Sequence, residues 1–288
     1  MSAGCGRGPL ADPATATRPQ GSPAGDGEVL RVEHITKSFG PIDVLHDINL
    51  HLRKGEALGL LGDNGSGKST LMKIICGFHR PDSGQMFLRG EPYAPRSVDQ
   101  ARSLGIDTVY QDLALIDELS VFLNMHLHRE RLRTPTPLLS IGEMKKRTRS
   151  ALDEIGVNLK RLDSPVARLS GGQRQAIAIA RTVYSDADIL LLDEPLAAMG
   201  AKEGAAILDL IQRIKEEGEV SMIIVAHNYV HVLETCDRVN LIQDGKIALD
   251  KKAADTSVEE LTEIVVEEYR RVRSEAALGE PRAGSSDA

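Results

Sequence analysis

The sequence predicts an α/β fold in which a mostly parallel sheet carries helices on both faces. Short apolar runs at 57–61, 189–192 and 221–226 have the length and composition of strands buried on both sides. Helical patterns follow along the chain at 68–77 and 202–217. Strands that alternate with helices are typical of a parallel sheet, so these observations together define the fold class.

Alternation of apolar and polar residues predicts further strands outside these runs. The additional strands are expected at 29–35, 44–52, 106–110, 239–242 and 246–249. The last two flank Asp244-Gly245, which is a hairpin turn signal.

Between 113 and 168 the pattern becomes helical and predicts an insertion into the α/β core. Ser140 and Glu143 form a capping-box sequence there, and Gly156 fits a helix end. A last helix is expected to open at Ser257. Its apolar stripe consists of Leu261, Ile264, Val265 and Tyr269.

One folded domain, residues 28–273, is expected between two tails, and it includes the helical insertion. Residues 1–27 contain six Gly and four Pro and few large apolar side chains, which predicts disorder. Residues 274–288 have the same character. A chain of 288 residues, 41% of them hydrophobic, is long enough for such a domain.

Composition excludes several functional classes. A net charge of −7 and only 3% aromatic residues argue against a nucleic-acid partner. Cys5, Cys76 and Cys236 are scattered without metal-ligand spacing, which indicates a reducing compartment, and Cys76 is expected in the core. No apolar run approaches the roughly 20 residues that span a bilayer, and no secretory signal is expected.

The most specific motif has the form G-x-x-x-x-G-K-[ST], which is a phosphate-binding loop. It consists of Gly62, Asp63, Asn64, Gly65, Ser66, Gly67, Lys68 and Ser69, with Thr70 following. Its backbone N–H groups can converge on phosphate oxygens at a helix N-terminus. Lys68 would approach the β- and γ-phosphates, and Ser69 would offer a hydroxyl to Mg²⁺. The flanking strand and helix argue against an ordinary Gly-rich turn.

Two further motifs are weaker alone. Asp193 could orient the Mg²⁺ shell and Glu194 could act as a general base toward water, although two acids after a strand can simply cap the next segment. A second anion site is predicted at a helix N-terminus, where an ordinary capping box is the alternative. It consists of Leu169, Ser170, Gly171, Gly172 and Gln173.

These motifs, in their order along the chain, resemble those of ATP-binding cassette (ABC) ATPases, and the resemblance covers about residues 29–250. The resemblance implies a P-loop NTPase fold of the ABC type, with an N-terminal antiparallel β subdomain and a helical insertion. It implies ATP and Mg²⁺ as cofactors. It also implies a head-to-tail dimer with a second copy, in which the signature 169–173 closes over the partner's γ-phosphate.

The resemblance assigns roles to three more residues. Gln111 would touch Mg²⁺ and water while its loop contacts a permease, His227 would contact the γ-phosphate, and Phe39 would stack on adenine. A surface glutamine, an ordinary histidine and a core phenylalanine are the alternatives. The implied catalytic residues are Lys68, Gln111, Glu194 and His227, and the implied Mg²⁺ ligands are Ser69, Gln111 and Asp193.

One segment departs from the family pattern. Many ABC ATPases carry Ser-Ala-Leu-Asp where this chain has Ala-Ala-Met-Gly at 197–200, so Gly200 replaces an aspartate that helps to couple the two sites. The departure puts communication between the sites in doubt. It leaves the residues of the chemistry in place.

The run 101–115 resembles the corresponding region of monosaccharide importer ATPases of the ribose, xylose and fructose type. This implies a subunit that powers sugar import from the cytoplasmic face of the membrane, held there by permease subunits and served by an extracytoplasmic solute-binding protein. An exporter or a non-sugar transporter remains an alternative. A soluble chromosome or ribosome factor would need long coiled coils or a second cassette, and a catalytically silent binding module would not need Glu194 and His227.

Overall fold

A computed structural model describes residues 27–127, 130–132, 138–154, 156–184, 187–197 and 199–279, with backbone only for 271–279. The tails were expected at 1–27 and 274–288, and residues 1–26 and 280–288 of them lie outside the described residues. The last helix runs through Gly279, past the expected domain boundary at 273. Glu and Ala after 273 are compatible with helix.

An antiparallel sheet forms the N-terminal layer, as expected, with strand order β2-β1-β4-β5. Its strands are β1 (Glu28–Phe39), β2 (Ile42–Arg53), β4 (Ser83–Leu88) and β5 (Glu91–Pro92). β4 and β5 were not predicted from the sequence. β4 buries only its last three residues in a continuous run, so it lacks the alternation that reveals a half-buried strand.

The larger sheet has the order β10-β9-β3-β8-β7-β6 and is parallel except for its edge strand β10. Its strands are β3 (Ala57–Leu61), β6 (Ile106–Val109), β7 (Ile189–Asp193), β8 (Ser221–Val225), β9 (Arg238–Gln243) and β10 (Lys246–Lys252). Every residue of β3 and β8 is buried. The predicted α/β fold class and the predicted hairpin at Asp244-Gly245 are confirmed.

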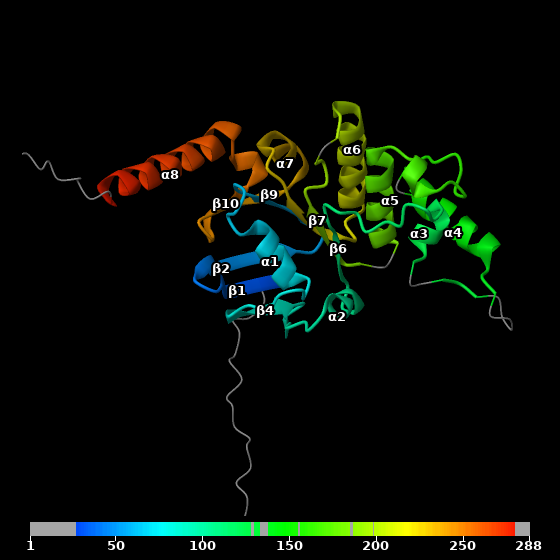
Figure 1. Cartoon of the computed structure of the whole chain (residues 1–288), viewed down its shortest axis with the longest axis horizontal. Helices are drawn as coiled ribbons and strands as arrows, with labels where there is room; N and C mark the ends of the chain where they lie inside the picture. The colour runs from blue at the N-terminus through cyan, green and yellow to red at the C-terminus, as the bar shows by residue number, and fades with distance from the viewer. Residues whose placement is uncertain are drawn as a thin grey trace, which may run out of the picture.

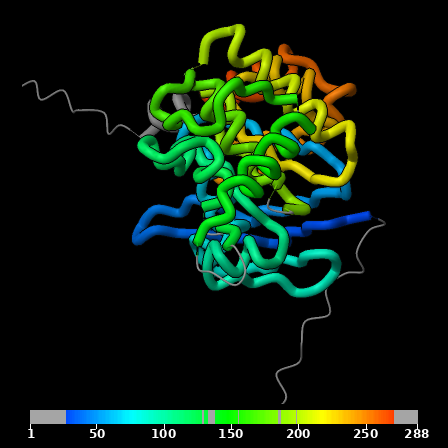
Figure 2. Tube along the Cα trace, turned by 90° about the vertical axis from the view of Figure 1, so that its right-hand side faces the viewer, coloured from blue at the N-terminus to red at the C-terminus, as the bar shows by residue number. Residues whose placement is uncertain are grey.

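Helices cover both faces of the larger sheet (Figure 1). They are α1 (Lys68–Ile75), α2 (Val98–Ser103), α3 (Val121–Met125), α4 (Ile141–Glu154), α5 (Gly171–Val183), α6 (Ala201–Glu217), α7 (Tyr229–Thr235) and α8 (Val258–Gly279), with short 3₁₀ turns at Val166–Arg168 and Ala253–Asp255. One core joins α1 and the antiparallel sheet to one face, and Cys76 lies in it as expected. The other core contains α3, α4, α5 and α6, which gather at the end of the molecule that faces the viewer in Figure 2.

Local signals set the helix ends that matter for the site. Ser170 Oγ accepts a hydrogen bond from the Gln173 backbone N–H at 3.3 Å, and Gln173 Oε1 accepts one from the Ser170 N–H at 3.1 Å. This is a complete capping box at the start of α5. α6 ends at Gly218, whose φ of +69° fits the left-handed helix end that glycine favours.

A buried ion pair joins the two sheets. Arg238 Nε donates to Glu56 Oε1 at 2.8 Å, and the two residues are only 6% and 8% exposed. Arg238 Nη1 also donates to Asp250 at 2.9 Å, and Nη2 donates to the carbonyl of His51. One guanidinium thus connects β9, β10, β2 and the turn before β3.

Replacing Arg238 with leucine should lower the free energy of unfolding by about 3–5 kcal/mol, because Glu56 would remain buried without its partner. Urea denaturation measures this loss. Lys251→Met removes the exposed pair of Lys251 with Glu260 and should cost at most about 1 kcal/mol. Equal losses of unfolding free energy in both variants would contradict the conclusion that the buried pair stabilises the fold more than the exposed pair does.

Candidate nucleotide-binding site

Four loops meet at one edge of the larger sheet. β3, β8, β7 and β6 are parallel neighbours, so their carboxyl ends lie side by side. The phosphate loop follows β3, and His227 follows β8. Asp193 ends β7 and Glu194 comes directly after it, while Gln111 follows β6. Sheet topology therefore collects the predicted site residues from positions as far apart as 62 and 227.

The backbone of the phosphate loop depends on glycine. Gly62, Gly65 and Gly67 have φ values of +145°, +87° and +108°, where other residues are strained. A Cβ at Gly62 would lie 2.2 Å from the carbonyl oxygen of Ile242, and a Cβ at Gly67 would lie 2.5 Å from Leu45 Cδ2. The loop can take this shape only with glycine at these two positions.

Polar groups of the loop are positioned to receive an anion. Lys68 is 6% exposed, and its Nζ donates to the carbonyl oxygens of Gly62 and Asp63, both at 2.7 Å. Both acceptors are neutral carbonyl oxygens, so these bonds do not neutralise the positive charge of Lys68, which can still attract a phosphate. Ser66 Oγ is buried and has no hydrogen-bond partner within the described part of the chain. Ser69 and Thr70 lie on the first turn of α1, beside the loop.

Charge and burial oppose each other around Lys68. Burial lowers the pKa of Lys68, and the carboxylates of Glu194, Asp63 and Asp193 act in the opposite direction. Burial and then the neighbouring Glu194 raise the pKa of Asp193, while Lys73 and Lys68 oppose that rise. The carboxylates and the ammonium group therefore share one partly desolvated space in which added phosphate or metal would change every charge balance.

Glu194 is held in a strained backbone conformation. Its φ is +50°, in the left-handed region that non-glycine residues rarely adopt. Its N–H donates to the Val225 carbonyl at 2.9 Å, which ties it to the neighbouring strand β8. Glu194 Oε1 lies 3.4 Å from His227 Nδ1. The structure thus brings the predicted base and the predicted γ-phosphate contact together.

Three predicted residues remain open to solvent. Gln111 is exposed, and the His227 side chain is 68% exposed. Phe39 is 42% exposed, so the alternative of a core phenylalanine is wrong. The Phe39 ring stands edge-on to His79, with ring centroids 5.2 Å apart, a neighbour that the sequence analysis did not single out.

The signature segment lies apart from the phosphate loop of its own chain. Ser170, Gly172 and Gln173 line a cavity of about 550 Å³ together with residues of α6. The cavity at the phosphate loop, about 320 Å³, shares no lining residue with it. Gly200, the departure from the family pattern, is the N-cap of α6 and offers no side chain to cap that helix.

A contact that the sequence analysis missed joins the last helix to the phosphate loop. The Tyr269 hydroxyl donates to Asp63 Oδ2 at 2.9 Å, and this bond raises the pKa of Tyr269. Tyr269 belongs to the predicted apolar stripe of α8. Helical periodicity identifies such a stripe but not the partner that it meets, 206 positions away.

The predicted metal ligands fit Mg²⁺ better than a metal held by protein alone. In the part of the chain that the structure describes, no three His, Cys, Asp or Glu side chains are grouped to hold a metal. Ser69, Gln111 and Asp193 offer a single carboxylate. Mg²⁺ is commonly bound by one or two carboxylates together with substrate phosphates, so a bound nucleotide would complete the set.

Comparison with known proteins identifies the family. Residues 45–197 match the family model described as ABC transporter. The xylose/arabinose import ATP-binding protein XylG of Sulfolobus acidocaldarius is 41% identical over 238 residues, which cover 83% of this chain and 94% of that protein. The fructose import ATP-binding protein FrcA of Rhizobium meliloti is 37% identical, over 76% and 86% of the two chains.

Ribose import ATP-binding proteins are also similar, but they are longer. RbsA of Hahella chejuensis is 35% identical over 83% of this chain, which corresponds to 47% of that protein. The chain therefore spans about half the length of these relatives. Among solved structures, cbiO1 of Clostridium perfringens has a TM-score of 0.71 at 27% identity, over 86% and 98% of the chains. The dimeric cassette MJ0796 with ADP and Pi has a TM-score of 0.66 at 26% identity, over 78% and 98%.

The chain belongs to the ABC transporter family, and it is an ATPase that binds and hydrolyses ATP. The resemblance inferred from the order of the motifs is confirmed. None of the helices in the described residues is both long enough and apolar enough to cross a membrane.

Asp193→Asn should raise the melting temperature of the nucleotide-free protein at pH 7. The raised pKa of Asp193 means that its ionised form destabilises the fold above that pKa, and the penalty disappears as pH falls below the ordinary value of 3.8. The gain should therefore shrink as the pH is lowered. Thermal melts across pH measure it.

The same variant should lose the extra stabilisation that ATP and Mg²⁺ give to the wild type. Asp153→Asn, a change at an exposed carboxylate on α4, serves as the control and should behave like the wild type. A lower melting temperature for nucleotide-free Asp193→Asn at pH 7 would contradict the assignment of Asp193 as a destabilising, ligand-directed carboxylate.

Proposed function

We propose that this chain is the ATP-hydrolysing subunit that powers import of a monosaccharide through a membrane permease. The observation that carries the proposal is the edge where Lys68, Asp193, Glu194 and His227 meet. The named xylose/arabinose, ribose and fructose import relatives support a sugar as the transported solute.

The geometry supports a site that is completed by a second copy. The phosphate loop holds the triphosphate through backbone N–H groups and Lys68, but the signature of the same chain lies in a different cavity. A head-to-tail dimer would place Ser170 and its glycines, at the N-terminus of α5, over the γ-phosphate bound by the partner. Two ATP molecules would then be enclosed between two chains.

Hydrolysis in this arrangement depends on Glu194 and its neighbours. Mg²⁺, when bound, would neutralise charge on the β- and γ-phosphates. Glu194, fixed by its strained backbone and its contact with His227, would accept a proton from the attacking water. Lys68 would stabilise the charge that develops on the transferred phosphoryl group. His227 would contact the γ-phosphate and orient the Glu194 carboxylate.

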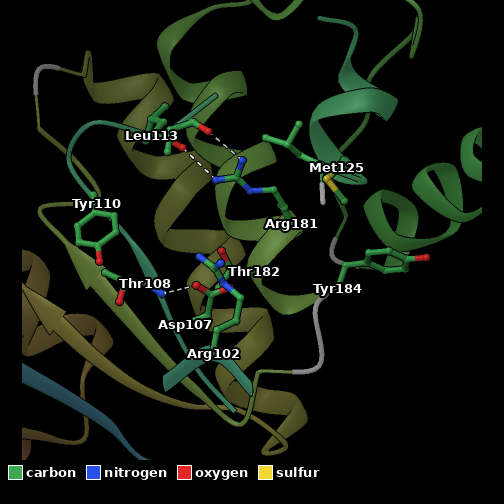
Figure 3. Close-up of a pocket in the computed structure, with 11 residues that line it drawn as sticks. Arg102, Asp107, Thr108, Tyr110, Leu113, Met125, Arg181, Thr182 and Tyr184 are labelled. Carbon is green, nitrogen blue, oxygen red and sulfur yellow. Dashed lines mark hydrogen bonds and ion pairs between the residues drawn. The ribbon is translucent and has the colours of Figure 1, made fainter. Parts of the chain in front are cut away.

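The proposal places the protein at the cytoplasmic face of the membrane, held by permease subunits. A cavity of about 370 Å³ opens beside the loop that carries Gln111, and Tyr110, Leu113 and Met125 line it (Figure 3). Its mixed polar and apolar wall suits a docked segment of a permease. An extracytoplasmic solute-binding protein would deliver the sugar, and closure of the ATPase dimer would drive the permease.

Glu194→Gln should lower ATP turnover by about 10²–10⁴-fold, because the general base is lost while nucleotide binding is kept. It should accumulate an ATP-bound dimer, which gel filtration with ATP detects. Lys68→Ala should instead lose ATP binding, and Glu217→Gln, at an exposed position on α6, should resemble the wild type. Normal turnover by Glu194→Gln would contradict the proposed mechanism.

Cells that carry Glu194→Gln at the chromosomal locus should lose uptake of one labelled monosaccharide from a panel. The sugar whose uptake is lost would be identified as the transported substrate. Undiminished uptake of every sugar, or a defect in efflux instead, would contradict the sugar-import proposal and leave the ATPase assignment intact.

A further inference from the structure

Arg181 connects two segments that are far apart in sequence. It lies on the last turn of α5 and reaches into the cavity beside the Gln111 loop (Figure 3). Arg181 Nη1 donates to the carbonyl of Ala114 at 3.0 Å, and Nη2 donates to the carbonyl of Leu113 at 3.2 Å. One guanidinium thus holds two successive peptide groups that lie 67 and 68 positions earlier in the chain.

Leu113 and Leu115 of this loop pack against the core, but the loop backbone has few hydrogen bonds. Among the described residues, the backbone of 111–115 makes no other hydrogen bond, either to backbone or to a side chain. Ala114 has a φ of +49°, an unusual value for a residue with a Cβ. The two bonds from Arg181 therefore fix a strained turn only three residues after Gln111.

Partial burial and neighbouring charges act on the Arg181 guanidinium in opposite directions. Burial lowers the pKa of Arg181, the carboxylate of Asp107 opposes that shift, and Arg102 adds to it. Arginine nevertheless stays protonated at any ordinary pH. Arg181 is half-buried, and the two loop carbonyls accept hydrogen bonds from its guanidinium donors.

We propose that Arg181 is a positioning residue that locks the Gln111 loop to the signature helix α5, so that both nucleotide-contacting segments move as one unit. Ser170 caps the start of α5 and Arg181 lies near its end, with about 16 Å of helix between them. Closure of the signature over ATP would then carry the Gln111 loop with it. The inference rests on the proposed roles of Gln111 and the signature.

Arg181→Lys and Arg181→Gln test the proposal, with steady-state ATPase kinetics as the readout. Lysine keeps the charge but lacks the planar fork that bridges two carbonyls. Both variants should lower kcat by about 10- to 100-fold, as expected when a catalytic group is misplaced by about 1 Å. KM for ATP should change little, because the phosphate loop is untouched.

Arg149→Lys is the matched control. Arg149 Nη1 donates to the carbonyl of Leu159 at 2.6 Å, so this variant also loses an arginine-to-carbonyl bond in the helical region, but one that does not reach the Gln111 loop. It should retain wild-type kcat. Equal loss of kcat in Arg149→Lys and Arg181→Lys, or full rescue by Arg181→Lys, would overturn the proposal.

A double-mutant cycle with Gln111→Ala separates positioning from general destabilisation. If Arg181 acts through Gln111, the double variant should turn over ATP as slowly as the slower single variant, with no further loss. If the fold-losses in kcat of the two single variants instead multiply in the double variant, the proposal is overturned. Wild-type turnover by Gln111→Ala would overturn it together with the proposed role of Gln111. Because sugar uptake is not the readout, a wrong substrate assignment would leave this test valid.

Discussion

Parallel pairing of β3, β8, β7 and β6 is the constraint on which the rest of the molecule depends. Each strand contributes one loop, and the register holds the loops side by side at the carboxyl edge of the sheet. Helices on both faces are needed to bury such a sheet, and they also separate the signature from the phosphate loop. The separation of the signature from the phosphate loop within one chain is thus a consequence of the topology.

Several features of this edge of the sheet lower the stability of the empty protein and are suited to binding a ligand. Lys68 is buried against neutral carbonyls, Asp193 is partly desolvated, and Glu194 is held in a strained conformation. Each feature costs folding free energy in the empty protein. Such costs are typical of ligand-binding sites, where a phosphate would offset the desolvation of Lys68 and a divalent cation would offset that of Asp193.

Local signals account for most of what could be predicted from the sequence. Buried strands, the glycines of the phosphate loop and the capping box of Ser170 each act over a few residues, and the structure contains all of them. β4 lacks alternation and was missed. The contacts of Arg181 with Leu113 and of Tyr269 with Asp63 could not be predicted, because no residue pattern encodes which distant backbone or carboxylate a side chain will meet.

The bond between Tyr269 and Asp63 also has a consequence during synthesis. The two residues are 206 positions apart, so at the usual translation rate of about 5–20 residues per second Tyr269 is made roughly 10 to 40 s after Asp63. Throughout that interval the nascent phosphate loop exists without its neighbour from α8. The loop reaches its final surroundings only after Tyr269 has left the ribosome.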